Sequence, residues 1–304
     1  MNTNPPSYNE IYNEIYSHKC NLQLKEETLQ FLINKYNIKT ALSQMLYMLK
    51  EFNIVLLCDD SGSMNTRNTY TKENGVSTTT TRWEEAKEFI LNILDFAMAL
   101  DDDGIDLFFL NRPPIFNVNN KEEVINTFQN IASGSTPLVK TLEKIYQKYK
   151  NTDKNILLLT ITDGLPDESE SEFKDVLKNM LKHQMPKFRI SLMLATDDEN
   201  TVDLYNRIDS EFDFFDVSDD YLSEYNEIIK IQGTNFKFSM GDYICKFLLS
   251  SICNDLDKLD EKKIDINKIV KYFTETYDKY GLAKTETYKS KKSRMNGLKK
   301  CTIL

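Results

Sequence analysis

Three oxygen-bearing side chains follow one apolar run near residue 60. Asp59, Ser61 and Ser63 occupy alternate positions directly after residues 54–58, and Gly62 allows the chain to turn tightly between the two serines. A carboxylate and two hydroxyls form an all-oxygen ligand set, which suits a small hard cation such as Mg²⁺ better than Zn²⁺. This spacing is common in acidic loops, so further ligands are needed before it indicates a metal site.

Two later segments supply those ligands. Residues 133–138 read Ser-Gly-Ser-Thr-Pro-Leu and place the hydroxyl of Thr136 in a glycine-containing loop. Residues 156–162 form a second apolar run, which leads into Asp163 and the sequence Gly-Leu-Pro. Short apolar runs of this kind are typical of strands that are buried on both faces of a parallel sheet. Ligands of open α/β sheets bind outside the carboxyl ends of such strands, so we expect the three segments to meet there.

The three segments together resemble the metal-ion-dependent adhesion site of von Willebrand factor A domains. Their order and spacing match that site, with helix-length segments between them, and the resemblance covers about residues 52–249. Ser135 stands where such sites commonly carry glycine, a departure that touches no expected ligand. The resemblance implies a site for Mg²⁺, with Mn²⁺ as a possible substitute, formed by five side chains: Asp59, Ser61, Ser63, Thr136 and Asp163.

The resemblance also implies a role for each of these side chains. The two serines would coordinate the ion directly, Thr136 would bind it directly or through water, and the two aspartates would hold coordinated waters. One position would stay open for a carboxylate from a partner protein. Neutral hydroxyl ligands leave the ion enough positive character to attract an acid. We expect Asp60 to lie outside this set, because side chains alternate along a strand and Asp60 therefore points away from Asp59.

The elements that position these loops alternate between strand and helix. From residue 52 onward, apolar runs alternate with segments of helical periodicity, which predicts an α/β fold with a mostly parallel sheet and right-handed crossovers. Residues 115–118 follow two prolines and suit an edge strand. We expect a doubly wound, Rossmann-like A domain with one antiparallel edge strand, helices on both faces, and extra helices at both ends of the chain. The expected parts are residues 1–50 (N-terminal segment and helices), 51–257 (A domain), 258–283 (C-terminal helix) and 284–304 (basic tail).

Three segments near this domain have individual predictions. Residues 40–52 and 240–256 each show helical spacing over their whole length, and we expect one helix in each. Residues 65–81 are polar and rich in Thr and Asn, and they are long for a connection between a strand and a helix. We predict a loop there that is either mobile or in contact with a partner.

Composition narrows the class of protein. The chain has 304 residues, of which 40% are hydrophobic, enough for a sizeable core. Its net charge of −9 disfavours nucleic acid as a partner. The five cysteines show no paired spacing, which indicates a reducing compartment and no zinc motif. Residues 1–10 contain no apolar segment of a secretory signal, so we expect a cytoplasmic protein.

The N-terminal segment allows two interpretations. Pro5, Pro6 and Tyr8 fit the pattern Pro-Pro-x-Tyr, in which a polyproline II turn presents an aromatic side chain to a WW domain. Ser7 and Glu10 also fit a helix-capping box, and the tyrosines and isoleucines that follow have helical spacing. The two interpretations are compatible, because a helix could begin at the tyrosine.

The last residues of the sequence have a different character. Residues 284–300 are rich in lysine, and residues 301–304 read Cys-Thr-Ile-Leu. This resembles a C-a-a-X box, in which Cys301 would be prenylated, with the terminal leucine favouring geranylgeranyl. The basic residues would add attraction to an anionic membrane surface. The alternative is a basic tail with an unmodified cysteine.

Two functions from different classes are consistent with the sequence. The first is a Mg²⁺-dependent adhesion or scaffold module that captures an acidic residue of a partner protein on the cytosolic face of a membrane. The second is a metal-dependent hydrolase on an α/β sheet. The sequence has no P-loop and no histidine in the three loops, and the two carboxylates are assigned to the waters of the metal. We therefore predict a binding protein and not an enzyme.

Overall fold

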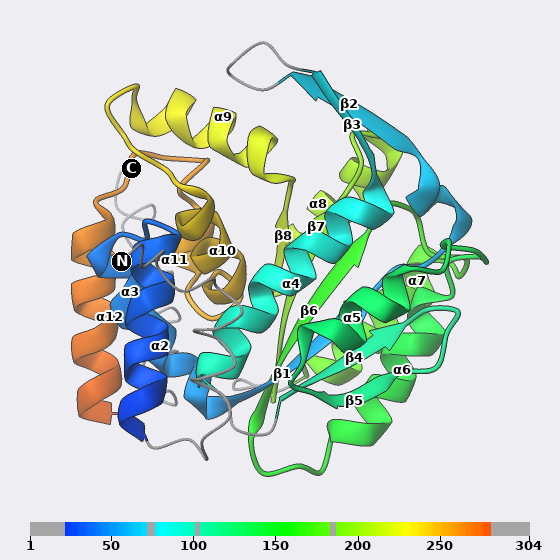
Figure 1. The fold of residues 1–304 in the computed structure, drawn as a ribbon, viewed down its shortest axis with the longest axis horizontal. Helices are drawn as coiled ribbons and strands as arrows, with labels where there is room; N and C mark the ends of the chain where they lie inside the picture. The colour runs from blue at the N-terminus through cyan, green and yellow to red at the C-terminus, as the bar shows by residue number, and fades with distance from the viewer. Residues whose placement is uncertain (1–21, 72–76, 101–103, 183–186, 281–304) are drawn as a thin grey trace, which may run out of the picture.

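A six-stranded sheet forms the centre of the molecule. The computed structural model describes residues 22–71, 77–100, 104–182 and 187–280, and its sheet has the order β5-β4-β1-β6-β7-β8 (Figure 1). Five strands pair in parallel: β1 (Phe52–Cys58), β4 (Ile105–Phe109), β6 (Asn155–Thr162), β7 (Phe188–Leu194) and β8 (Phe215–Ser218). The edge strand β5 (Ile115–Val118) pairs antiparallel with β4. The predicted α/β fold with a mostly parallel sheet and one antiparallel edge strand is confirmed.

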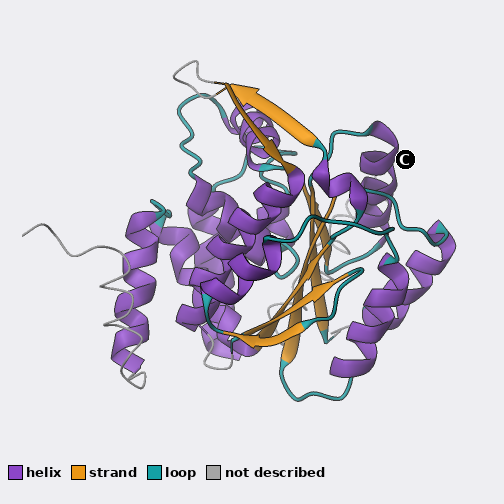
Figure 2. Cartoon of the chain, turned by 45° about the vertical axis from the view of Figure 1, so that its right-hand side comes forward, coloured by secondary structure: helices purple, strands orange, loops and turns teal. Residues whose placement is uncertain are grey.

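Helices cover both faces of this sheet (Figure 2). Alternate residues of β1 enter different apolar cores: Ile54 and Leu56 lie in one cluster, and Val55 and Leu57 in the other. The first cluster includes residues of α4 (Arg82–Leu100), α5 (Lys121–Phe128), α9 (Tyr221–Gln232) and α10 (Met240–Leu249). The second includes residues of α6 (Leu138–Tyr149), α7 (Glu170–Met180) and α8 (Glu199–Glu211). This doubly wound arrangement explains why the central strands are apolar along their whole length.

The helices near the two ends of the described chain extend the first core. Buried residues of α2 (Leu22–Lys35), α3 (Thr40–Leu46), α11 (Asn254–Asp257) and α12 (Ile266–Tyr280) belong to the same cluster as the sheet residues. Gly241 on α10 allows a close approach there, because a Cβ atom at this position would lie 2.4 Å from the carbonyl oxygen of Tyr36. The terminal helices therefore pack against the sheet domain.

Three predicted elements differ from the structure. The predicted helix at residues 40–52 ends with α3, and a 3₁₀ helix (Tyr47–Glu51) follows, because Phe52 already pairs with Asn155 in the sheet. The predicted helix at residues 240–256 divides into α10 and α11, and Ser251 between them hydrogen-bonds Ser191 of β7. The predicted polar loop contains an antiparallel hairpin, β2 (Arg67–Thr71) and β3 (Ser77–Thr81). Its threonines are β-branched, a property that favours strands even without an apolar pattern.

Some predicted features fall outside the described part of the chain. Pro5, Pro6, Tyr8 and Cys301 lie in residues 1–21 and 281–304, which the structure does not describe. Among the described residues, no helix is both long and apolar enough to cross a membrane.

Candidate metal centre

The carboxyl ends of β1 and β6 bring two of the predicted loops together. Cys58 at the end of β1 pairs with Ile161 of β6, and the backbone N–H of Asp59 donates to the carbonyl oxygen of Ile161 over 2.8 Å. Asp59 and Asp163 therefore follow adjacent strands at the same edge of the sheet. Both side chains are buried, whereas Ser63 in the loop after β1 is exposed. The exposed side of the site is therefore at Gly62 and Ser63, because Ser61 is buried as well.

Hydrogen bonds connect the hydroxyls of this site to one carboxylate. The hydroxyl oxygens of Ser61 and Ser63 are 3.0 Å apart, and the Ser63 hydroxyl donates to Asp163 Oδ1 over 2.7 Å. Adjacent oxygens around an octahedral Mg²⁺ ion, at its usual bond length, are about 2.9 Å apart. The separation of the two serine hydroxyl oxygens, which are the expected direct ligands, is close to this value.

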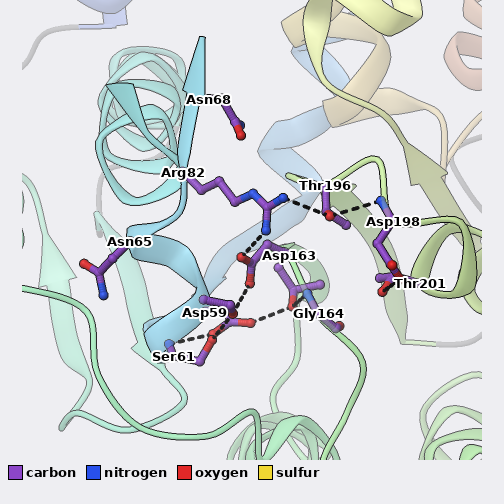
Figure 3. Close-up of polar contacts among 12 residues, drawn as sticks. Asp59, Ser61, Asn65, Asn68, Arg82, Asp163, Gly164, Thr196, Asp198 and Thr201 are labelled. Carbon is purple, nitrogen blue, oxygen red and sulfur yellow. Dashed lines mark hydrogen bonds and ion pairs between the residues drawn. The ribbon is translucent and has the colours of Figure 1, made fainter. Parts of the chain in front are cut away.

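Asp59 lies behind the two serines. Its Oδ1 accepts the backbone N–H of Ser61 over 2.7 Å, and its Oδ2 accepts the hydroxyl of Thr162 over 2.7 Å (Figure 3). Burial raises the pKa of Asp59 to about 6, although the hydrogen bonds from Thr162 and Ser61 act in the opposite direction. Both oxygens have protein donors, so Asp59 fixes the turn that presents the serines.

The loop that carries Thr136 is attached to both of the other loops. Gly134 accepts the backbone N–H of Gly62 through its carbonyl oxygen over 3.1 Å. Thr136 and Asp167 exchange two bonds, from the Thr136 N–H to Asp167 Oδ1 and from the Asp167 N–H to the Thr136 carbonyl oxygen. The Thr136 hydroxyl lies beside Gly164, where an added Cβ would be 3.8 Å from it. All five predicted ligands therefore lie around one edge of the sheet.

Asp60 is directed away from the site, as the strand alternation predicts. Its Oδ1 accepts the backbone N–H of Asn111, and its Oδ2 pairs with Arg112 Nε at 3.1 Å. The Asn111 side chain also donates to the carbonyl oxygen of Ser135, and the Arg112 side chain donates to the carbonyl oxygen of Ile131 over 2.6 Å. These contacts hold the Thr136 loop against β1. Asn111 and Arg112 were absent from the prediction, because their contacts join segments that no linear pattern links.

Arg82 was also absent from the predicted site. It begins α4, its Nη1 lies 2.7 Å from Asp163 Oδ2, and its Nη2 donates to the hydroxyl of Thr196 over 3.1 Å (Figure 3). Its backbone N–H donates to the carbonyl oxygen of Thr66, at the base of the β2–β3 hairpin. Only the fold brings this residue beside Asp163.

The donor set at this edge fits a hard divalent cation. Three hydroxyls would supply oxygen ligands and two carboxylates would hold coordinated waters, an all-oxygen surrounding of the kind that Mg²⁺ prefers. The described residues contain no group of three or more His, Cys, Asp or Glu side chains suited to a metal ion. The candidate site differs from such groups, because three of its five residues are serine or threonine. Metal binding at these residues stays a prediction.

Comparison with known proteins does not assign the chain to a family. No family model matches it, and no curated protein matches it. Among solved structures, the chain is similar to the crystal structure of a pilus adhesin, SpaC from Lactobacillus rhamnosus GG, with 13% sequence identity and a TM-score of 0.39 over 69% of this chain. The match covers 30% of the adhesin chain. A likeness of this degree defines neither the family nor the activity.

Proposed function

We propose that this protein is a Mg²⁺-dependent protein-binding module of the von Willebrand factor A kind. The observation that supports it is the pair of hydroxyl oxygens of Ser61 and Ser63, 3.0 Å apart, beside the buried carboxylate of Asp163, which accepts the Ser63 hydroxyl over 2.7 Å. The donor set supports Mn²⁺ as a substitute ion.

The proposed partner is a protein that presents an Asp or Glu side chain to the ion. Hydroxyl ligands are neutral, so an ion held mainly by them keeps a positive charge for an incoming carboxylate. Gly62 and Ser63 are exposed, which leaves room for that group. Ile131 and Leu165, on the two neighbouring loops, are 76% and 44% exposed and would contact apolar groups beside the partner's acid.

The test of this function is metal binding followed by partner capture. We expect wild-type protein to bind Mn²⁺ in an electron paramagnetic resonance titration, and Thr136→Ala to weaken binding at least about ten- to hundredfold, the loss typical when even a group that supports a metal's ligands is removed. Thr152→Ala provides the control, because Thr152 precedes β6 at the opposite end of the strand. Capture of a partner from lysate in Mg²⁺ should be lost with EDTA and with Thr136→Ala. Equal Mn²⁺ affinity in wild type and Thr136→Ala would remove this site from the mechanism.

A turnover assay separates the binding module from the alternative hydrolase. Phosphoesters incubated with the protein and Mg²⁺ or Mn²⁺ should remain intact if the site only binds. Clear hydrolysis that disappears in Asp163→Ala would replace the proposed function with the enzymatic one.

We also propose a peripheral location on the cytosolic face of a membrane. Where Leu304 is the last residue of the protein, Cys301 is the acceptor of an isoprenoid, whose burial contributes about 0.8 kcal/mol per methylene-sized unit. Each nearby lysine or arginine adds about 1 kcal/mol on an anionic leaflet. Cys301→Ser should therefore move the protein from the membrane to the soluble fraction of a cell lysate. Persistent membrane association of this variant would contradict the lipid anchor.

A further inference from the structure

A largely buried arginine already contacts one carboxylate of the proposed metal site. Arg82 Nη1 lies 2.7 Å from Asp163 Oδ2, and the side chains of the pair are 12% and 0% exposed. The buried Nε of Arg82 has no hydrogen-bond acceptor within the described part of the chain. The guanidinium is therefore held by the ion pair with Asp163 and by one hydrogen bond to Thr196.

The two oxygens of Asp163 have different partners. Oδ1 accepts the hydroxyl of Ser63, a proposed ligand, whereas Oδ2 accepts from Arg82. A charge-assisted bond of this length is among the strong ones, and in a buried place it is little screened by salt. Arg82 therefore withdraws negative charge from the carboxylate that a divalent ion would share.

The net charge of the site depends on this arginine. Asp59 and Asp163 with Arg82 carry one net negative charge when both aspartates are ionised. Binding of a divalent ion changes this to one net positive charge, whereas the same site without the arginine would be neutral. A site with a net positive charge attracts a carboxylate from a distance. A site with no net charge attracts it only at short range, through contact with the metal ion itself.

We propose that Arg82 is a specificity-determining residue of the site, which weakens divalent-ion binding and makes the ion-loaded site select an anionic partner group. The inference depends on the proposed function, because it assigns a role to a residue beside that metal. The second arginine at this edge, Arg112, pairs with Asp60, which is not a proposed ligand. Of these two arginines, only Arg82 pairs with a carboxylate of the proposed metal site.

The experiment is a Mn²⁺ titration of the full chain, followed by electron paramagnetic resonance, with Arg82→Gln, Arg82→Lys and Arg207→Gln. Arg82→Gln should bind Mn²⁺ about tenfold more tightly, the size expected for removing a single positive charge next to a divalent one in a high dielectric. Arg82→Lys keeps the charge and should stay within about threefold of wild type. Arg207→Gln removes an exposed arginine that pairs with Glu170, and it should leave the affinity unchanged.

A second measurement uses acetate as the anionic probe. With Mn²⁺ bound, acetate that enters the open position displaces a metal-bound water and lowers the relaxation enhancement of water protons. Arg82→Gln should require several times more acetate than wild type for the same change, because the loaded site has lost its net charge. The opposite directions of the two effects separate this role from a structural one, since a loosened site would bind Mn²⁺ more weakly.

The outcomes distinguish this inference from the proposed function. Wild-type protein that does not bind Mn²⁺ would overturn both. Wild-type binding with equal or weaker Mn²⁺ affinity in Arg82→Gln would overturn the role of Arg82 and leave the metal site in place. If Arg82→Gln does not fold by circular dichroism, Arg82→Met, whose unbranched chain keeps part of the packing, is measured with the same expected gain in affinity.

Discussion

At the scale of the residue, Gly134 determines how the threonine loop reaches the other two. Its φ of +117° lies in the region that side-chain-bearing residues rarely adopt. A Cβ atom at this position would also lie 2.3 Å from Asn111 Oδ1. Asn111 cannot move away freely, because it bonds both Asp60 and Ser135. Backbone conformation and packing therefore both require glycine here.

We predict that Gly134→Ala lowers stability by about 2–4 kcal/mol, from backbone strain together with the clash on Asn111. Gly233→Ala is the matched control, because Gly233 has a φ of +107° but no atom within 4 Å of an added Cβ. It should cost about 1 kcal/mol from the backbone alone. Urea unfolding measures both changes. Equal losses of stability in the two variants would show that the clash with Asn111 adds nothing to the backbone strain. Unchanged Mn²⁺ binding by Gly134→Ala would show that the site tolerates movement of this loop.

The candidate ligands could be predicted from the sequence, whereas the residues around them could not. Asp59, Ser61 and Ser63 are close in the chain, and their pattern with Thr136 and Asp163 can be compared with a known site. Arg82 and Arg112 have no such signal, because each acts through an ion pair with a residue far away in the chain or in another segment. Contacts of this kind follow from the register of the strands, which is not visible in composition or spacing.

At the scale of the element, apolar runs predicted the sheet and amphipathic segments predicted most of the helices. The β2–β3 hairpin was missed because it has no apolar face, and its strands pair through the backbone of threonine-rich segments. The hairpin stands at the carboxyl edge of the sheet (Figure 1), and its base is attached to α4 through the Arg82–Thr66 bond. Two strands, Arg67–Thr71 and Ser77–Thr81, thus lie beside the site within a segment that was predicted as a polar loop.

The break between α10 and α11 shows a different limit of periodicity. Helical spacing continues through residues 240–256, but the chain turns at Ser250 and Ser251, both of which are buried. The Ser251 hydroxyl bonds Ser191 of β7 at 2.9 Å, a tertiary contact that a continuous helix would not provide. Helical periodicity could not reveal the break, because buried residues continue on both sides of it.

At the scale of the whole molecule, a buried charge cluster joins the last strand to the helices that follow it. Lys246 of α10 is 1% exposed and pairs with Glu224 of α9 at 3.0 Å and with Asp260 at 3.4 Å. Further carboxylates surround this lysine: Asp209, Asp216, Asp219 and Asp257. Buried Oδ1 of Asp216 and Oε2 of Glu224 have no hydrogen-bond partner among the described residues. One buried lysine therefore faces an excess of acids, of which Asp216 and Glu224 are themselves buried.

Burial raises the pKa of several acids in this cluster. It raises the pKa of Glu224 to about 7, with Lys246 acting against the rise and Asp260 with it. Burial also raises the pKa of Asp209 to about 7 and that of Asp219 to about 6, and it holds the pKa of Asp216 well above its usual range. A carboxyl whose pKa is higher in the folded state binds more protons there than in the unfolded chain. Its contribution to stability is complete below the unfolded value and is lost as the pH rises through the folded one.

We therefore predict that the protein is more stable at pH 5.5 than at pH 8, with a melting temperature higher by about 4 °C from a change on the order of 2 kcal/mol. Glu224→Gln should reduce this difference, because glutamine does not ionise and only the other acids around Lys246 then titrate. Glu143→Gln removes an exposed carboxylate from α6 and should leave the difference unchanged. Differential scanning calorimetry at both pH values measures it. A melting temperature that rises from pH 5.5 to pH 8, with no change in this rise in Glu224→Gln, would contradict the prediction that these acids are protonated in the folded chain at pH 5.5.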